Sequence, residues 1–206
     1  MIPEITLSPE AMTPEEFRRI AEGIQDRLIP PKYGRLFGVD PMLSTGYFDC
    51  VGLVLIGRKN SALSHYPTIG TMYQLELLEE IPDSIPDPEG MIPVRKRDPM
   101  MAVVKQPEEY IQSMIKWTTG YHTQVEREKD LVAIPFGGEK GHIGLVVDAL
   151  NARGMPVVEH GTCGHFSDAE LGGGQGQLIV IPEERRVLYH TVYDKKVLEI
   201  RVNHKE

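Results

Sequence analysis

The feature that most constrains the fold is a pair of apolar segments joined by a short turn. Residues 51–56 (Val-Gly-Leu-Val-Leu-Ile) are continuously apolar between turn signals, and their length and β-branched content favour a buried strand. Residues 57–60 predict a turn, and a second strand then ends at His65. The sequence therefore predicts an antiparallel hairpin whose open end carries Cys50 on one strand and His65 on the other.

This hairpin places a thiol beside an imidazole. A cysteine near its ordinary pKa is only a few per cent ionised at neutral pH, and an adjacent imidazole can accept its proton. Cys50 is therefore a candidate nucleophile and His65 a candidate base. The alternative interpretation is structural, because buried cysteines often behave as small hydrophobic residues, and His65 would then be an ordinary core or surface histidine.

Composition narrows the class of protein. The chain has 206 residues, which suits a single domain spanning 1–206, and its 41% apolar content is enough for a core. The net charge is -8 and the one basic cluster is Arg95-Lys-Arg97, which argues against nucleic-acid binding. Residues 1–10 do not resemble a signal peptide, and no apolar run has the length of a membrane span. We expect a cytoplasmic protein without membrane insertion, whose Cys50 and Cys163 stay reduced.

The N-terminal and middle regions predict additions to this core. Thr13-Pro14-Glu15-Glu16 predicts a capping box at the start of a helix whose apolar face extends to Leu28. Residues 1–40 are therefore interpreted as an N-terminal helical extension. Residues 67–130 are interpreted as a long insertion, with a proline-rich loop at 82–93 and helical spacing at 107–117.

The second half of the chain alternates between strand and helix patterns. The sequence predicts a helix at 142–153. It predicts strands at 131–136, 155–159, 178–181, 187–192 and 197–202.

Four segments follow one another in a recognisable order: Cys50-Val-Gly-Leu-Val-Leu55, Ala62-Leu-Ser-His65, Ala133-Ile-Pro-Phe-Gly-Gly138 and Glu170-Leu-Gly-Gly-Gly-Gln-Gly176. In this order and approximate spacing, over roughly residues 43–66 and 131–190, the chain resembles CheD, the chemoreceptor glutamine deamidase family. The resemblance implies an α+β fold with a mixed β-sandwich core flanked by helices. The same fold is shared in outline by the cytotoxic necrotizing factor deamidases.

The resemblance also implies roles for individual residues. Cys50 corresponds to the family's nucleophile and His65 to its histidine. The family's third catalytic residue is a threonine six positions before the cysteine, where this chain has Ser44, and Thr45 follows one position later. Either hydroxyl is a candidate for orienting the imidazole. A turn near the site is the candidate substrate-binding segment, made of Gly172, Gly173, Gly174 and Gln175.

The chain departs from the family directly before the nucleophile. Phe48-Asp49 replaces a small Gly-Ser pair, and a carboxylate beside a thiol raises the thiol pKa unless it is turned away. The family's arginine after the glycine turn is Gln177 here. The connection 67–130 is much longer than the fold requires, and residues 160–169 form a second insertion. We expect both insertions to shape the mouth of the site and to narrow what can enter.

The second insertion contains His160-Gly-Thr-Cys163-Gly-His165, whose side chains are of the kinds that bind zinc or another transition metal. The segment lacks a clear fourth ligand and a recognised spacing, so a glycine-rich loop at the rim of the site is the favoured interpretation. We expect neither a metal nor an organic cofactor.

The resemblance, together with the Cys50–His65 pair, implies a cysteine-dependent amidohydrolase that deamidates glutamine side chains of a protein or peptide substrate. Its place in chemotaxis is implied by the resemblance alone. One alternative is a catalytically inactive binding protein on the same fold. The other is a related cysteine hydrolase or effector with a different target.

Overall fold

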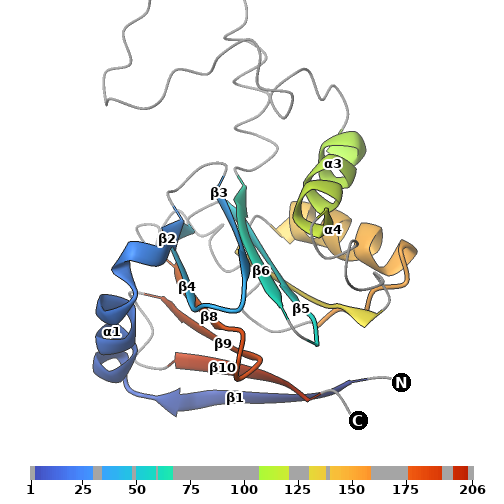
Figure 1. Cartoon of the computed structure of the whole chain (residues 1–206). Helices are drawn as coiled ribbons and strands as arrows, with labels where there is room; N and C mark the ends of the chain where they lie inside the picture. Colours follow the sequence, from blue (N-terminus) through green and yellow to red (C-terminus); the bar gives the residue numbers. More distant parts are fainter. Residues whose placement is uncertain are drawn as a thin grey trace, which may run out of the picture.

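The structure is a computed structural model, and Figure 1 shows its course. It describes residues 3–29, 34–47, 50–58, 60–66, 107–120, 130–137, 140–158, 176–191 and 197–203. The helices are α1 (Pro14–Gly23), a short 3-10 helix (Gln25–Arg27), α3 (Pro107–Thr119) and α4 (Lys140–Ala152). The strands are β1 (Glu4–Met12), β2 (Leu28–Ile29), β3 (Gly34–Gly38), β4 (Met42–Tyr47), β5 (Val51–Ile56), β6 (Ser61–Tyr66), β7 (Val132–Gly137), β8 (Gly176–Ile181), β9 (Arg186–Thr191) and β10 (Val197–Asn203).

The strands form two sheets that pack face to face (Figure 1). The larger sheet has the order β1-β10-β9-β8-β4-β2, and the smaller has the order β3-β6-β5-β7. β2 pairs with β4 in parallel, whereas the other pairings between these strands are antiparallel. The expected α+β class with a mixed β-sandwich is therefore confirmed.

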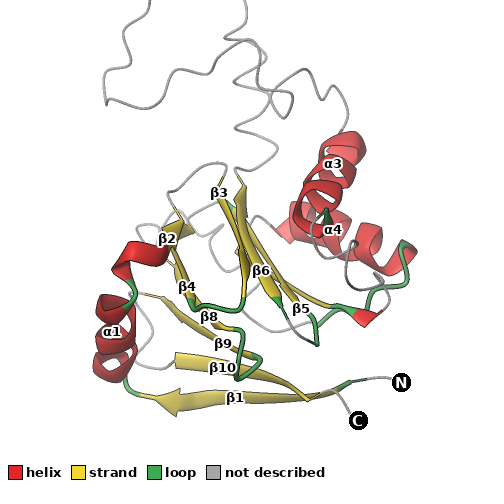
Figure 2. Cartoon of the chain, in the orientation of Figure 1, coloured by secondary structure: helices red, strands yellow, loops and turns green. Residues whose placement is uncertain are grey.

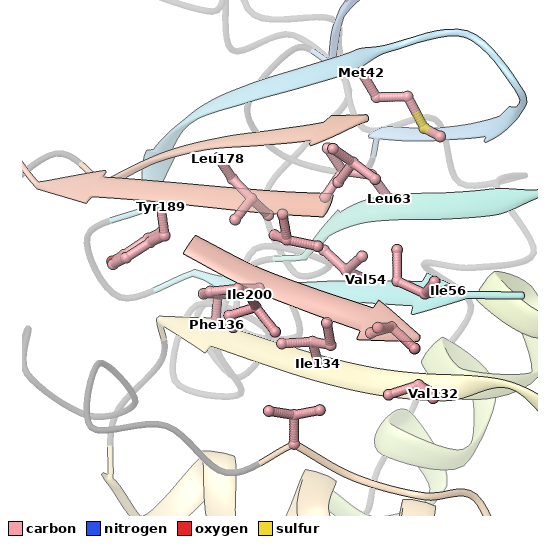
Figure 3. Packing of buried hydrophobic residues seen from close by; sticks show 14 of the residues in the cluster. Met42, Val54, Ile56, Leu63, Val132, Ile134, Phe136, Leu178, Tyr189 and Ile200 are labelled. Carbon is pink, nitrogen blue, oxygen red and sulfur yellow. The ribbon is translucent and has the colours of Figure 1, made fainter. Parts of the chain in front are cut away.

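The core between the sheets follows from alternation along each strand. On β5, Val54 and Ile56 belong to the cluster between the two sheets, whereas Val51, Leu53 and Leu55 belong to the cluster beneath α3 and α4. Both faces of β5 are thus buried, which explains its continuous apolar run. Figure 3 shows side chains of both sheets meeting in the inter-sheet layer.

Helices cover the outer faces of the sandwich (Figure 2). On α1, Phe17 and Ala21 pack against Leu43, Ile179, Leu188 and Val197 of the larger sheet. α3 and α4 cover the smaller sheet through Ile111, Met114, Ile115, Ile143, Val146 and Leu150. No helix in this described part of the chain is long and apolar enough to cross a membrane.

The start of α1 confirms the predicted capping box. The Glu16 backbone amide donates to Thr13 Oγ1 at 3.2 Å, and the Thr13 backbone amide donates to Glu16 Oε2 at 2.8 Å. Two hydrogen bonds to its carboxylate lower the pKa of Glu16 below its ordinary value. The bond from the Thr13 backbone amide has the larger effect, and the bond from the Thr13 hydroxyl the smaller. The helix ends at Gly23, before the expected Leu28, because Leu28 and Ile29 pair with β4 instead.

The description of residues 1–40 as a helical extension is corrected by the structure. Strands β1, β2 and β3 flank α1, and β1 is the edge strand that pairs along β10. Its sequence alternates poorly and contains Pro9, which is tolerated at a sheet edge. β1 is therefore defined by a partner at the other end of the chain, a contact that local pattern does not reveal.

Two further expectations change. The segment before Cys50 carries the turn signals that precede the predicted strand, but Met42–Tyr47 is the strand β4, held by antiparallel pairing with the distant β8. Of the strand expected at 155–159, the described residues 155–158 form an isolated parallel bridge between Val157 and Ala133. In the expected insertion 67–130, helical spacing at 107–117 correctly predicted α3, while 67–106 and 121–129 lie outside the described residues.

The two ends of the sandwich are distinguished by a contact between turns. Arg185, in the turn between β8 and β9, donates from Nη2 to the backbone carbonyl of Arg58 at 3.1 Å. Arg58 lies in the turn between β5 and β6, where the Gly57 amide donates to the Asn60 carbonyl. Both turns therefore occupy one end, and the residues that open β5 and β8 lie at the opposite end.

Candidate active site

The orientation of strand β4 determines whether the side chain of Ser44 or that of Thr45 points into the core. Met42 belongs to the inter-sheet cluster and Leu43 to the cluster beneath α1, so successive side chains of β4 face opposite ways. Ser44 follows Met42 inward and is fully buried. Thr45 follows Leu43 on the outer side and is half-buried. Of the two candidates, the fold therefore brings Ser44 into the sandwich.

His65 lies on the inner face of β6, next to Leu63 of the inter-sheet cluster, and its side chain is fully buried. Its Nδ1 atom is 3.1 Å from Ser44 Oγ, so a buried hydrogen bond joins the two sheets. Nε2 of the same imidazole is also buried. A hydroxyl on one ring nitrogen fixes the orientation of the ring and leaves the other nitrogen for a different contact.

Cys50 directly precedes β5 and is a thiol with 8% of its surface exposed. It belongs to the same inter-sheet cluster as Val54 and Ile56, so it faces the layer that contains His65. Gly52 is paired with His65 in the register of β5 and β6, and Cys50 lies two residues earlier. Cys50 and His65 are thus diagonal neighbours on one face of adjacent antiparallel strands, as predicted. We predict a distance of about 3–4 Å between the Cys50 sulfur and the nearer ring nitrogen of His65.

Two glycines shape the surroundings of the thiol. Gly52, opposite His65, has no side chain that would separate the imidazole from Cys50. Gly137, paired with Val51 beside Cys50, has a φ of 65°, a left-handed conformation that favours glycine. β7 therefore ends at Gly137, opposite the residue that follows Cys50.

The other face of β6 is anchored to α3 through buried hydroxyl groups. Thr118 Oγ1 lies 2.6 Å from the Tyr66 hydroxyl and 3.1 Å from Ser64 Oγ, and it donates to the Met114 carbonyl. The Tyr66 hydroxyl also donates to that carbonyl. Since His65 lies between Ser64 and Tyr66 in the chain, this network fixes the backbone that carries the imidazole. Sequence patterns did not reveal it.

Several predicted residues lie outside the described part of the chain. These are Phe48 and Asp49 before the nucleophile, Gly172, Gly173, Gly174 and Gln175 of the candidate substrate-binding turn, and His160, Cys163 and His165 of the second cluster. Gly176, the last glycine of the same run, is described and opens β8.

No protein-family model matches the chain, and no curated protein matches it either.

Proposed function

We propose that the protein is a cysteine-dependent amidohydrolase in which Cys50, His65 and Ser44 act together. The observation that carries this proposal is the buried 3.1 Å hydrogen bond between Ser44 Oγ and His65 Nδ1, with Cys50 on the same face of the adjoining strand. A nucleophile, a base and a group that orients the base form the arrangement expected of an activated cysteine.

The hydrogen bond to Ser44 gives the two imidazole nitrogens different tasks. In the tautomer that carries its proton on Nδ1, this N–H donates to Ser44 Oγ, and Nε2 holds the lone pair. Nε2 then takes the proton of the Cys50 thiol, and Ser44 keeps the ring from rotating away. Thr45, on the outer side of β4, has no part in this arrangement.

The reaction proceeds through a thioester. The Cys50 thiolate attacks the carbon of a carboxamide, and the carbonyl electrons move to the oxygen. Collapse of this tetrahedral intermediate expels ammonia, which takes its proton from the imidazolium of His65. Water then attacks the thioester, with His65 as base, and releases a carboxylate and the thiol. These steps require no metal or organic cofactor.

We propose a glutamine side chain of a protein or peptide as the substrate. The resemblance to the CheD family supports this choice. The burial of Cys50, at 8% exposure, favours a slender side-chain amide over a bulky main-chain segment. The proposed reaction changes one glutamine to glutamate and leaves the polypeptide uncut.

The test is to incubate the protein with unfolded casein and to measure ammonia release and the masses of casein peptides. The account predicts ammonia release with matching conversion of glutamine to glutamate, both abolished by Cys50→Ala and retained by Cys163→Ala. New peptide ends without ammonia would instead identify a peptide-cleaving cysteine hydrolase.

A second candidate is a binding protein that keeps the fold without the chemistry. The observation that favours it is the same low exposure of Cys50, which is typical of a structural cysteine. In that case casein would stay unchanged, and Cys50 would react with iodoacetamide no faster at neutral pH than an ordinary thiol.

A further inference from the structure

Tyr189, on the inner face of β9, is a buried aromatic residue that the proposed reaction does not yet use. Its side chain is 2% exposed and belongs to the inter-sheet cluster. The ring stacks on Phe136 of β7, with centroids 5.1 Å apart and planes at 30° (Figure 3). This stack and the Ser44–His65 hydrogen bond are two contacts that join the sheets.

The two contacts align the sheets with each other. One row of paired residues in the smaller sheet is His65, Gly52 and Phe136. One row in the larger sheet is Ser44, Leu178 and Tyr189. Since the first members of the two rows are in contact and so are the last, the middle members lie opposite each other. β8 therefore lies over β5, with Leu178 above Gly52.

The contact between the turns gives the direction along the strands. Arg185 and Arg58 mark one end of the sandwich, so β8 and β5 both begin at the other end. On β8, Gly176 lies two residues before Leu178, toward the end where both strands begin. Cys50 lies two residues before Gly52 of β5 in the same direction. Gly176 and Cys50 thus face each other across the inter-sheet layer.

The Tyr189 hydroxyl lies against Gly176. A methyl group added at Gly176 would be 2.7 Å from Tyr189 Oη and 3.1 Å from the nearest ring carbons. The close approach of the hydroxyl therefore favours glycine at this position. The phenol extends from its stack on Phe136 toward the end of the layer where Cys50 is placed.

We propose that the Tyr189 hydroxyl donates a hydrogen bond to the oxyanion that forms when Cys50 attacks a carbonyl group. This inference rests on the proposed function and adds a residue to it. In the step, the sulfur–carbon bond forms, the carbonyl π electrons move to oxygen, and the phenol O–H donates to that oxygen without transferring its proton. A donor placed in a buried layer, where water does not compete, stabilises such a charge strongly.

Comparing the rates of acylation and alkylation of Cys50 distinguishes stabilisation of the oxyanion by Tyr189 from activation of the thiol. p-Nitrophenyl acetate acylates the thiolate through an oxyanion, whereas iodoacetamide alkylates it by direct displacement and forms none. Both rates are measured in a Cys163→Ser background, in wild type, Tyr189→Phe and Tyr66→Phe. Tyr66→Phe is the matched control. Its buried phenol hydroxyl lies on the opposite face of β6, so any displacement of His65 that its loss causes slows both reactions alike.

The proposal predicts that Tyr189→Phe slows acylation by about 10²- to 10³-fold. In Tyr189→Phe, alkylation and its pH profile stay at the wild-type values. Tyr66→Phe leaves the ratio of the acylation rate to the alkylation rate at the wild-type value. Equal loss of acylation and alkylation, or no loss of acylation, overturns the role of Tyr189. A wild-type protein that does not acylate at all contradicts the proposed function itself, and the role of Tyr189 with it.

Circular dichroism establishes that each variant is folded. If Tyr189→Phe does not fold, 3-fluorotyrosine at position 189 tests the role of the hydroxyl instead. It keeps the ring and carries a more acidic hydroxyl, which is a stronger hydrogen-bond donor. An acylation rate that changes while alkylation does not supports the proposal. An unchanged acylation rate overturns it.

Discussion

Ser44 Oγ and His65 Nδ1 lie 3.1 Å apart although their strands belong to different sheets. Both side chains are fully buried, and Cys50 shares their layer. The position of the imidazole therefore depends on how the two sheets are stacked as well as on the hairpin that carries Cys50 and His65.

Replacing Ser44 tests whether its hydroxyl orients the base. We expect Ser44→Ala to raise the apparent pKa at which Cys50 reacts with iodoacetamide and to slow the reaction at neutral pH, because the imidazole loses its partner on Nδ1. Thr45→Ala, one residue away on the outer side of β4, is the control and should leave the profile unchanged. Identical profiles for the two variants would show that Ser44 has no orienting role.

The hydroxyl network on the other face of β6 should contribute to stability. Thr118→Val leaves the buried hydroxyls of Ser64 and Tyr66 without one partner, which we expect to lower the free energy of unfolding by about 1–3 kcal/mol. Thr119→Val removes a single local bond to the Lys116 carbonyl and should cost less. Urea denaturation of both variants measures the difference, and equal losses would mean that the network adds nothing of its own.

Gly176 and Tyr189 should be energetically coupled. Gly176→Ala inserts a methyl group 2.7 Å from Tyr189 Oη, and we expect a loss of about 1–3 kcal/mol in the free energy of unfolding. Adding Tyr189→Phe removes the nearest atom and should recover part of the loss, since ring carbons remain at 3.1 Å. A double-mutant cycle measures the coupling, and strictly additive effects would contradict this contact.

The capping box of α1 predicts a pH-dependent contribution from Glu16. Its pKa is lowered in the folded state, so its stabilising effect is present above its unfolded pKa and is lost as the pH falls through the folded value. The difference in stability between wild type and Glu16→Ala should therefore shrink in acid. Thr13→Ala removes the N-cap and should cost about 1 kcal/mol at neutral pH. A Glu16→Ala difference that grows on acidification would contradict the sign of this effect.

The sequence predicted best where structure is local or its apolar pattern is strong. The strand at Val51–Ile56, the helix after Thr13 and the meander from Gly176 to Asn203 carry their own signals of periodicity, capping and turns. β1 and β4 were missed, because each is defined by pairing with a strand more than a hundred residues away in the chain.

The same distinction applies to the site. The hairpin placed Cys50 and His65 on one face, since turn and alternation are local properties. The choice between Ser44 and Thr45 required the stacking of β4 over β6, which no local pattern contains. Tyr189 carried no sequence signal, because an aromatic residue in an apolar strand is indistinguishable from ordinary core until its neighbours are known.

In the proposed reaction, His65 activates Cys50. The most direct test is the pH dependence of Cys50 alkylation by iodoacetamide in a Cys163→Ser background, where Cys50 is the one remaining cysteine. His65→Asn is compared with wild type, and His190→Asn, which alters a histidine against Phe17 of α1, serves as the control. The account predicts a wild-type midpoint well below the ordinary thiol pKa of about 8.5, an upward shift in His65→Asn and no shift in His190→Asn. A midpoint at or above that value in wild type, unchanged by His65→Asn, would contradict it.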